Sequence, residues 1–165
     1  MVNEDDLVQQ AMEALPVIGR RLFASMTNHP VNVGRPLGQV KALAYLYRSA
    51  PSTVKDVARF LDIAMPTASE LIDRLVDEGL VERSVNPADR RQVLLDLAPH
   101  AREVGRQIHA MRLAQIRAAM DLLEPEERPV FAKSLQALAT VLEREAHTLT
   151  TDDVTDAPTL AGTSS

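Results

Sequence analysis

The sequence predicts a mainly α-helical chain that carries one short β-hairpin, an α+β arrangement. Apolar residues recur with the 3.6-residue period of helices along most of the chain, and the period changes to two only within residues 80–97. The length of 165 residues fits one domain with a short appendage, because domains typically hold about 150 residues. With 45% hydrophobic but only 3% aromatic residues, the core must be mostly aliphatic.

The first two predicted helices lie on either side of a loop. The first follows an apolar stripe from Leu7 to Met26, and Pro16 should kink it or divide it into two pieces. Residues 28–37 contain two prolines and a glycine, which is typical of a loop. The second helix starts near Leu37 and ends at the segment 49–52.

Two short helices follow in close succession. The first begins after Ser52 or Thr53, because either side chain can accept a backbone N–H at a helix start. The second has Pro66 in its first turn, where the missing N–H costs nothing, and Gly79 as its C-terminal stop.

The predicted hairpin consists of residues 80–85 and 92–97, joined by a charged six-residue tip. A long helix then starts near Pro99, and a last helix ends near His147. Residues 148–165 include six Thr, two Ser and three Asp, and we expect this tail to be disordered because it cannot bury enough apolar surface.

This order of elements is typical of a helix-turn-helix with a wing. In that arrangement the second short helix enters the DNA major groove and the first braces it across the backbone. A hairpin directly after the second helix forms the wing, whose basic tip is placed to reach the adjacent minor groove. A two-stranded ribbon cannot seat a cofactor at its strand ends, so the layout of an α/β enzyme is excluded.

Residues 37–101 resemble the MarR family of winged helix-turn-helix transcription regulators. The residues that carry the resemblance are Pro66-Thr67-Ala68-Ser69, Ile72-Asp73-Arg74-Leu75, Gly79-Leu80-Val81-Glu82-Arg83 and Asp89-Arg90-Arg91. The resemblance implies a homodimer that binds double-stranded DNA at a pseudo-palindromic site and represses genes until a small phenolic or otherwise amphipathic effector releases it. It also implies an N-terminal dimerisation helix with its loop (1–36), a DNA-binding domain (37–97), C-terminal dimerisation helices (98–147) and the tail (148–165).

The candidate DNA-contacting residues of the second short helix lie opposite its apolar stripe or at its N-terminal edge. Thr67 and Ser69 can bond to phosphates or base edges, and Met65 can contact a thymine methyl group. Arg74 can reach a phosphate. Glu70 either accepts a hydrogen bond from a cytosine amino group or points away from the DNA. The candidates are Met65, Pro66, Thr67, Ser69, Glu70 and Arg74.

The candidate residues of the wing are Asp89, Arg90 and Arg91. In the family's pattern the Asp braces the Arg two residues on, which enters the minor groove, so Asp89 is expected to position Arg91 while Arg90 holds a phosphate. Arg83, at the end of the first strand, either contacts the DNA backbone or pairs with Glu82 or Asp96.

The chain departs from the family's pattern at two helix starts. Ala64 stands where the family commonly has Ser or Thr before the recognition helix, and residues 97–101 lack the usual Leu-Thr and Gly. We therefore expect two N-caps to be missing, each worth about 1 kcal/mol.

The net charge of −5 argues against binding to nucleic acid by bulk charge. Three of these negative charges lie in the predicted tail, and residues 53–91 carry six basic and eight acidic residues. Affinity for DNA must then depend on geometry, dimer spacing and a few local cations such as Lys41, Arg48, Arg90 and Arg91. A winged-helix scaffold dimer that does not bind DNA remains the alternative.

No catalytic residue, cofactor or metal site is predicted. The chain has no Cys, which excludes disulfides, thiolate metal sites and thiol redox sensing, and its four His show no metal-binding spacing beyond His100 with Glu103. No signal peptide or membrane span is present in the sequence, so we expect a cytoplasmic protein with no membrane partner. Side chains able to line an effector cavity, or simply to pack between helices, are Tyr45, Tyr47, Arg48, His109 and Arg112.

Overall fold

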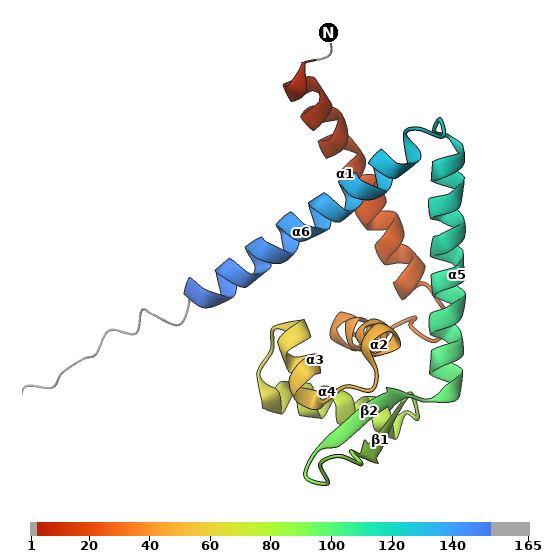
Figure 1. Cartoon of the computed structure of the whole chain (residues 1–165). Helices are drawn as coiled ribbons and strands as arrows, with labels where there is room; N and C mark the ends of the chain where they lie inside the picture. Colours follow the sequence, from red (N-terminus) through yellow and green to blue (C-terminus); the bar gives the residue numbers. More distant parts are fainter. Residues whose placement is uncertain (1–2, 153–165) are drawn as a thin grey trace, which may run out of the picture. The chain divides into compact units, whose positions relative to one another are not determined.

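The computed structural model describes residues 3–152 (Figure 1). By its internal contacts the chain divides into two compact units, one ending at Arg112 and one starting at Leu113. The elements are α1 (Glu4–Thr27), α2 (Leu37–Ser49), α3 (Val54–Leu61), α4 (Met65–Asp77), β1 (Val81–Val85), β2 (Val93–Leu97), α5 (Pro99–Asp121) and α6 (Arg128–Asp152). The predicted order of helices, short helix pair, hairpin and long helices is confirmed.

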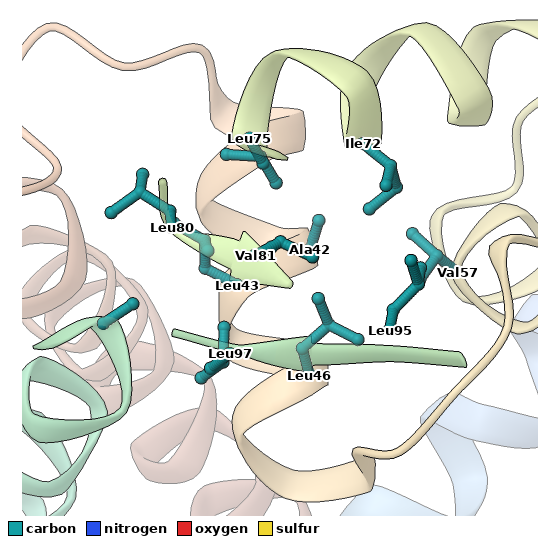
Figure 2. Close-up of a cluster of buried hydrophobic side chains, with 11 residues drawn as sticks. Ala42, Leu43, Leu46, Val57, Ile72, Leu75, Leu80, Val81, Leu95 and Leu97 are labelled. Atoms are coloured by element: carbon teal, nitrogen blue, oxygen red, sulfur yellow. The ribbon is translucent and has the colours of Figure 1, made fainter. Parts of the chain in front are cut away.

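One aliphatic core holds α2, α3, α4 and the hairpin together, as Figure 2 shows. Leu46 of α2, Ile72 and Leu75 of α4, and Leu95 of β2 are fully buried in it. The cluster contains no aromatic residue among its fully buried members, in agreement with the composition. Because the core fixes the inner face of α4, it also determines which side chains of α4 face outward.

The hairpin is antiparallel, and its base is held by a third segment. Its register runs from the pair Val81 and Leu97 to the pair Val85 and Val93. Ser52, in the connection between α2 and α3, exchanges two backbone hydrogen bonds with Leu95, at 3.1 and 2.7 Å. Strand β2 is therefore bound along both edges at its middle residue, whereas the tip of the hairpin extends beyond the core.

For the long helices, one of two open alternatives at Pro16 is ruled out and one predicted helix end was wrong. Pro16 lies inside α1, which continues as one helix from Glu4 to Thr27, so the helix is not divided into two pieces. A proline removes one hydrogen bond, and the flanking turns of a long helix can keep theirs. Helix α6 continues past the predicted end near His147 to Asp152, because residues 148–152 contain neither Gly nor Pro to stop it. The remainder of the predicted tail, residues 153–165, lies outside the described residues.

Helix α1 has no buried residue, although it carries a long apolar stripe. Its large exposed apolar residues are Leu7, Val8, Met12, Leu15, Val17, Ile18, Leu22 and Phe23. Helix α6 likewise exposes Val130, Leu135, Leu138, Val141 and Leu142. Soluble monomers rarely expose contiguous apolar surface of this extent.

Of the helices within residues 3–152, none combines the length and hydropathy that crossing a bilayer requires.

Candidate nucleic-acid interface

Helix α4 presents one buried and one exposed face. Ala68, Ile72 and Leu75 are buried, and Pro66 occupies the first turn as predicted. The structure places the six candidate residues on or beside the opposite face. Ser69 is half-buried, and the exposed ones are Met65, Pro66, Thr67, Glu70 and Arg74. The side chains of this face offer methyl, hydroxyl, carboxylate and guanidinium groups to a partner.

The start of α4 lacks a side-chain cap, as predicted. Ala64 has the extended backbone of an N-cap residue, with φ −62° and ψ 147°, but no side-chain oxygen to accept a backbone N–H. Asp62, which ends α3 with φ 54° in the left-handed region, makes the sharp turn between the two helices. Pro66 has no N–H, so the uncapped start of α4 leaves the backbone N–H groups of Met65 and Thr67 available to an anion.

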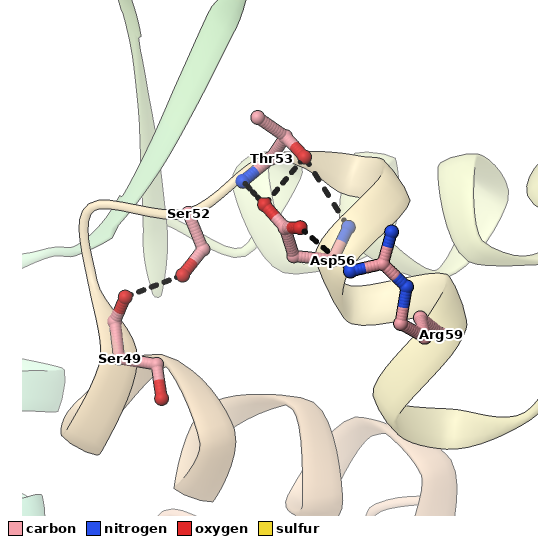
Figure 3. A network of polar contacts seen from close by, with 5 residues as sticks. All are labelled: Ser49, Ser52, Thr53, Asp56 and Arg59. Carbon is pink, nitrogen blue, oxygen red and sulfur yellow. Dashed lines mark hydrogen bonds and ion pairs between the residues drawn. The ribbon is translucent and has the colours of Figure 1, made fainter.

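Helix α3 begins with a complete capping box, shown in Figure 3. The Asp56 amide donates to Thr53 Oγ1 at 3.2 Å, and the Thr53 amide and hydroxyl donate to Asp56 Oδ2 at 2.9 and 2.6 Å. These hydrogen bonds, aided by the charges of Arg59 and Lys55, hold the pKa of Asp56 below its usual value of 3.8 against the opposing effect of burial. Of the two predicted starts, after Ser52 or after Thr53, the structure confirms the start after Thr53.

An ion pair that the sequence did not reveal joins α4 to the hairpin. Arg83 Nη2 lies 2.6 Å from Asp73 Oδ1. The expected partners, Glu82 and Asp96, are opposite one another in the register, whereas Arg83 is opposite Leu95. Successive strand residues point to opposite faces, so Arg83 is turned away from both. Asp96 pairs with Arg102 instead.

The tip of the wing, residues 86–92, is ordered by side-chain to backbone hydrogen bonds. Asn86 Oδ1 accepts from the Ala88 amide at 3.0 Å, and Asp89 Oδ1 accepts from the Arg91 amide at 3.0 Å. Such turns mimic a backbone turn with a side chain. Asp89 thus contacts the backbone of Arg91 and not its guanidinium group.

Ion pairs engage only some of the charged side chains at this interface. Within residues 53–91, Asp56, Asp73 and Glu78 form ion pairs with Arg59, Arg83 and Arg35. Four exposed cations of the same segment have no ion-pair partner among residues 3–152, and they are Lys55, Arg74, Arg90 and Arg91. Five carboxylates of the segment form no ion pair with a described residue either, so the segment offers individual exposed cations to a polyanion without a net positive charge.

A cavity of about 280 Å³ lies within the first unit, beside the core. All five side chains named from the sequence line it: Tyr45, Tyr47, Arg48, His109 and Arg112. Tyr45 stacks on Phe60 of α3 with ring centroids 4.6 Å apart, and Tyr47 lies 6.1 Å from the His109 ring. These side chains therefore line a cavity, and Tyr45 and Tyr47 also pack against rings of neighbouring helices.

Two buried polar atoms of the cavity wall have no hydrogen-bond partner among the described residues. They are Asn32 Oδ1, an acceptor, and Arg112 Nε, a donor. Asn32 Nδ2 donates to the Met26 carbonyl at 2.8 Å and Arg112 Nη2 to the Leu22 carbonyl at 3.2 Å, so both side chains are held in place. Sequence reasoning missed Asn32, because an Asn in a loop with Pro and Gly is ordinarily an exposed turn residue.

The suspected spacing of His100 and Glu103 does not form a metal site in the part of the chain that the structure describes. Glu103 is engaged by Arg106 and Gln107, which hold the pKa of its carboxyl group below the usual range. No group of three or more potential ligands occurs within residues 3–152.

Comparison with known proteins agrees with this geometry. The family model described as "MarR family" matches residues 36–93. YfiV and YsmB of Bacillus subtilis, both HTH-type transcriptional regulators, are 30% and 31% identical over 105 and 107 residues. These matches cover 64% and 65% of this chain and 66% and 73% of the relatives.

The fold itself matches solved structures over most of the chain. FabT of Streptococcus pneumoniae, solved in complex with DNA, superposes with a TM-score of 0.67 over 83% of this chain and 98% of FabT, at 22% identity. The family model, the two relatives and the shared winged-helix fold agree with one another. The chain belongs to the MarR family of transcriptional regulators.

Proposed function

We propose that the protein is a non-catalytic, cytoplasmic repressor that binds a pseudo-palindromic DNA site as a homodimer. In each half-site α4 lies in the major groove and the tip of the wing in the minor groove. The observation that carries this proposal is the pairing of an outward face on α4 with a wing tip whose Arg90 and Arg91 are exposed and free of ion pairs among the described residues.

On α4 the roles follow from side-chain chemistry. Thr67 and Ser69 bond to phosphates or base edges near the uncapped helix start, and Arg74 binds a phosphate. Glu70 is exposed, and its carboxylate is repelled by phosphates unless it accepts from a cytosine amino group. Met65 and Pro66 supply apolar contact to a thymine methyl group.

On the wing, Arg91 enters the minor groove and Arg90 holds a phosphate. Asp89 acts through the backbone, because its carboxylate accepts the Arg91 amide at 3.0 Å and leaves the guanidinium group unpaired. A carboxylate that bound the guanidinium group directly would compete with the DNA for it.

The dimer explains the exposed apolar faces of α1 and α6. We assign residues 1–36 and 98–147 to dimerisation and residues 37–97 to DNA binding. A second copy of the chain is the partner whose own apolar stripes match these faces, since a two-fold interface uses the same surface on both subunits.

The cavity is the proposed effector site. Its wall contains Lys41, Arg48 and Arg112, and none of the described residues that line it is Asp or Glu. The free Arg112 Nε donor and the stacked Tyr45 and Phe60 rings favour a small aromatic ligand that carries an anionic oxygen. A phenolic or carboxylic acid meets these requirements.

DNA binding is tested by selecting a duplex from a random library and measuring gel shifts across a salt series. We expect Arg91→Ala to weaken binding about tenfold or more and to reduce the salt slope by about 1. The matched control is Arg106→Ala, whose guanidinium group is exposed but already paired with Glu103, and which should stay within about twofold of the wild type. If the wild type prefers no duplex over random DNA at low salt, the scaffold alternative replaces this proposal.

The effector class is tested with two probes of equal size and opposite charge, benzoate and benzylamine. Benzoate at millimolar concentration should raise the melting temperature, and Arg112→Leu should abolish the rise. An equal or larger rise with benzylamine contradicts the assignment of an anionic ligand.

A further inference from the structure

The loop of residues 28–36, here called the cavity-wall loop, contacts both the cavity and the end of the recognition helix. Val31 and Asn32 line the cavity. Arg35, at the other end of the loop, reaches the residue that ends α4. The two proposed sites of the protein are therefore joined by a short stretch of chain.

Arg35 makes three interactions that fix its guanidinium group. Its Nε donates to the Val31 carbonyl at 3.2 Å, and its Nη1 donates to Gln39 Oε1 at 3.1 Å. The same Nη1 forms an ion pair with Glu78 Oε2. The Arg35 side chain is only 15% exposed and Gln39 is buried, whereas the Glu78 side chain is 44% exposed, so the guanidinium group is held within the protein and the carboxylate meets solvent.

The ion pair holds the C-terminal end of α4. Glu78 is the C-cap residue of this helix, and its own amide donates to the Arg74 carbonyl. The chain then turns at Gly79, which has φ 69°, before β1 begins. A displacement of Glu78 therefore changes the orientation of the helix that carries the DNA-contacting side chains.

The other end of the cavity-wall loop is anchored to α1. Asn32 is buried, and its Nδ2 donates to the Met26 carbonyl at 2.8 Å. Its Oδ1 has no partner within the described part of the chain, so an occupant of the cavity that donates a hydrogen bond would act on this side chain. The contacts run from Asn32 and Val31 through Arg35 to Glu78 without a gap.

We propose that Arg35 is a positioning residue for DNA recognition: it fixes the end of the recognition helix to the wall of the cavity. This inference rests on the proposed function. Arg35 itself contacts no DNA. Arg35 determines the orientation of α4 toward the DNA. The conformation of the cavity-wall loop determines the position of Arg35, and through it the position of the α4 end.

The test distinguishes an effect of the α4 orientation on DNA affinity from an effect of the protein's net charge on DNA affinity. Arg35→Gln and Glu78→Gln break the same ion pair but change the net charge in opposite directions. Both should lower the ratio of affinities for the selected duplex and for random duplex by about five- to tenfold, with the salt slope unchanged. The exchanged pair, Arg35→Glu with Glu78→Arg, should restore the ratio to within about twofold of the wild type.

A contrasting variant identifies a direct contact. Arg74→Gln removes an exposed cation proposed to bind phosphate, so it should weaken binding to both duplexes and lower the salt slope by about 1. The melting temperature of each variant is recorded, and all affinities are measured well below the lowest one. A loss of stability alone then leaves the affinity ratio unchanged.

A second pair of variants tests the path through the loop. Asn32→Ala frees the loop at α1 and should lower the affinity ratio in the wild type, but it should have little further effect in Arg35→Gln. If the effects of Asn32→Ala and Arg35→Gln on the affinity ratio add, the inference is overturned and the proposed function stands. The same holds if the wild type discriminates between the two duplexes and the single variants keep its affinity ratio. If the wild type does not discriminate between duplexes, the proposed function and the inference fail together.

Discussion

Replacement of Gly105 by Ala should place a methyl group in space that the Tyr47 ring already occupies. A Cβ built at Gly105 lies 2.8 Å from both Cγ and Cε2 of Tyr47, and closer still to Cδ2. The clash includes the fixed end of the ring, so rotation of a flexible tip cannot relieve it. Helices α2 and α5 must move apart or Tyr47 must leave its position in the cavity wall.

The magnitude follows from two opposing contributions. Overpacking of a tight contact costs about 1–3 kcal/mol. Replacing Gly by Ala inside a helix contributes about 1 kcal/mol in the stabilising direction. We therefore expect Gly105→Ala to lower the free energy of unfolding by about 1 kcal/mol. In a Tyr47→Ala background the ring is absent, and the same substitution should raise the free energy of unfolding by about 1 kcal/mol.

The assay is urea denaturation of the full-length wild type, Gly105→Ala, Tyr47→Ala and the double variant. All are measured at one protomer concentration, because the stability of the proposed dimer depends on concentration. The reversal of sign between the two backgrounds is the diagnostic result. If Gly105→Ala has the same effect in both backgrounds, the tight contact between Gly105 and Tyr47 does not exist in solution.

Four further outcomes are expected. Ala64→Ser should raise the free energy of unfolding by about 0.5–1 kcal/mol in urea denaturation, because Ala64 has N-cap geometry without a capping oxygen. The pKa of Asp56 is lowered on folding, so its contribution to stability is present above its unfolded pKa of 3.8 and is lost as the pH falls below that value through the lowered pKa of the folded state. Asp56→Asn should therefore show a smaller loss of stability on acidification than the wild type. Asp73→Asn frees Arg83 and removes one negative charge, and should raise the affinity for random duplex in gel shifts at low salt. Light scattering at micromolar concentration should give twice the chain mass of 18.1 kDa, and a value near the single mass would contradict the dimer.

The elements of the DNA-binding unit could be predicted from the sequence because their signals are local. Thr53 and Asp56 form a capping box within four residues, and Pro66 and Gly79 mark the ends of α4. The change of period from 3.6 to two marked the hairpin. Each of these signals depends on neighbours in the chain, so no knowledge of the fold was needed.

The partners of the charged side chains could not be predicted in this way. Arg83 is adjacent to Glu82 in the sequence but pairs with Asp73 of α4, because alternation along the strand turns Arg83 away from Glu82. Arg35 lies 43 residues from Glu78. A partner so distant depends on how the helices pack, and a single sequence contains no direct record of that packing.

One part of the candidate site could be predicted from the sequence and another part could not. The five cavity residues named from the sequence are correctly placed, since each lies on a helix whose apolar face could be recognised. Asn32 and Gly105 were missed because their importance depends on an unpaired oxygen and on a close approach to Tyr47. The DNA contacts of α4 and the wing stay predictions.

The backbone pairing of Ser52 with Leu95 also covers the outer edge of β2. An uncovered strand edge is a template for association with another chain, so this pairing protects the sheet against aggregation at its middle. It also separates the fixed base of the hairpin from its tip, where residues 87–91 are exposed. Insertions at the tip should therefore be tolerated, and the reach of the wing can be lengthened by engineering without disturbing the core.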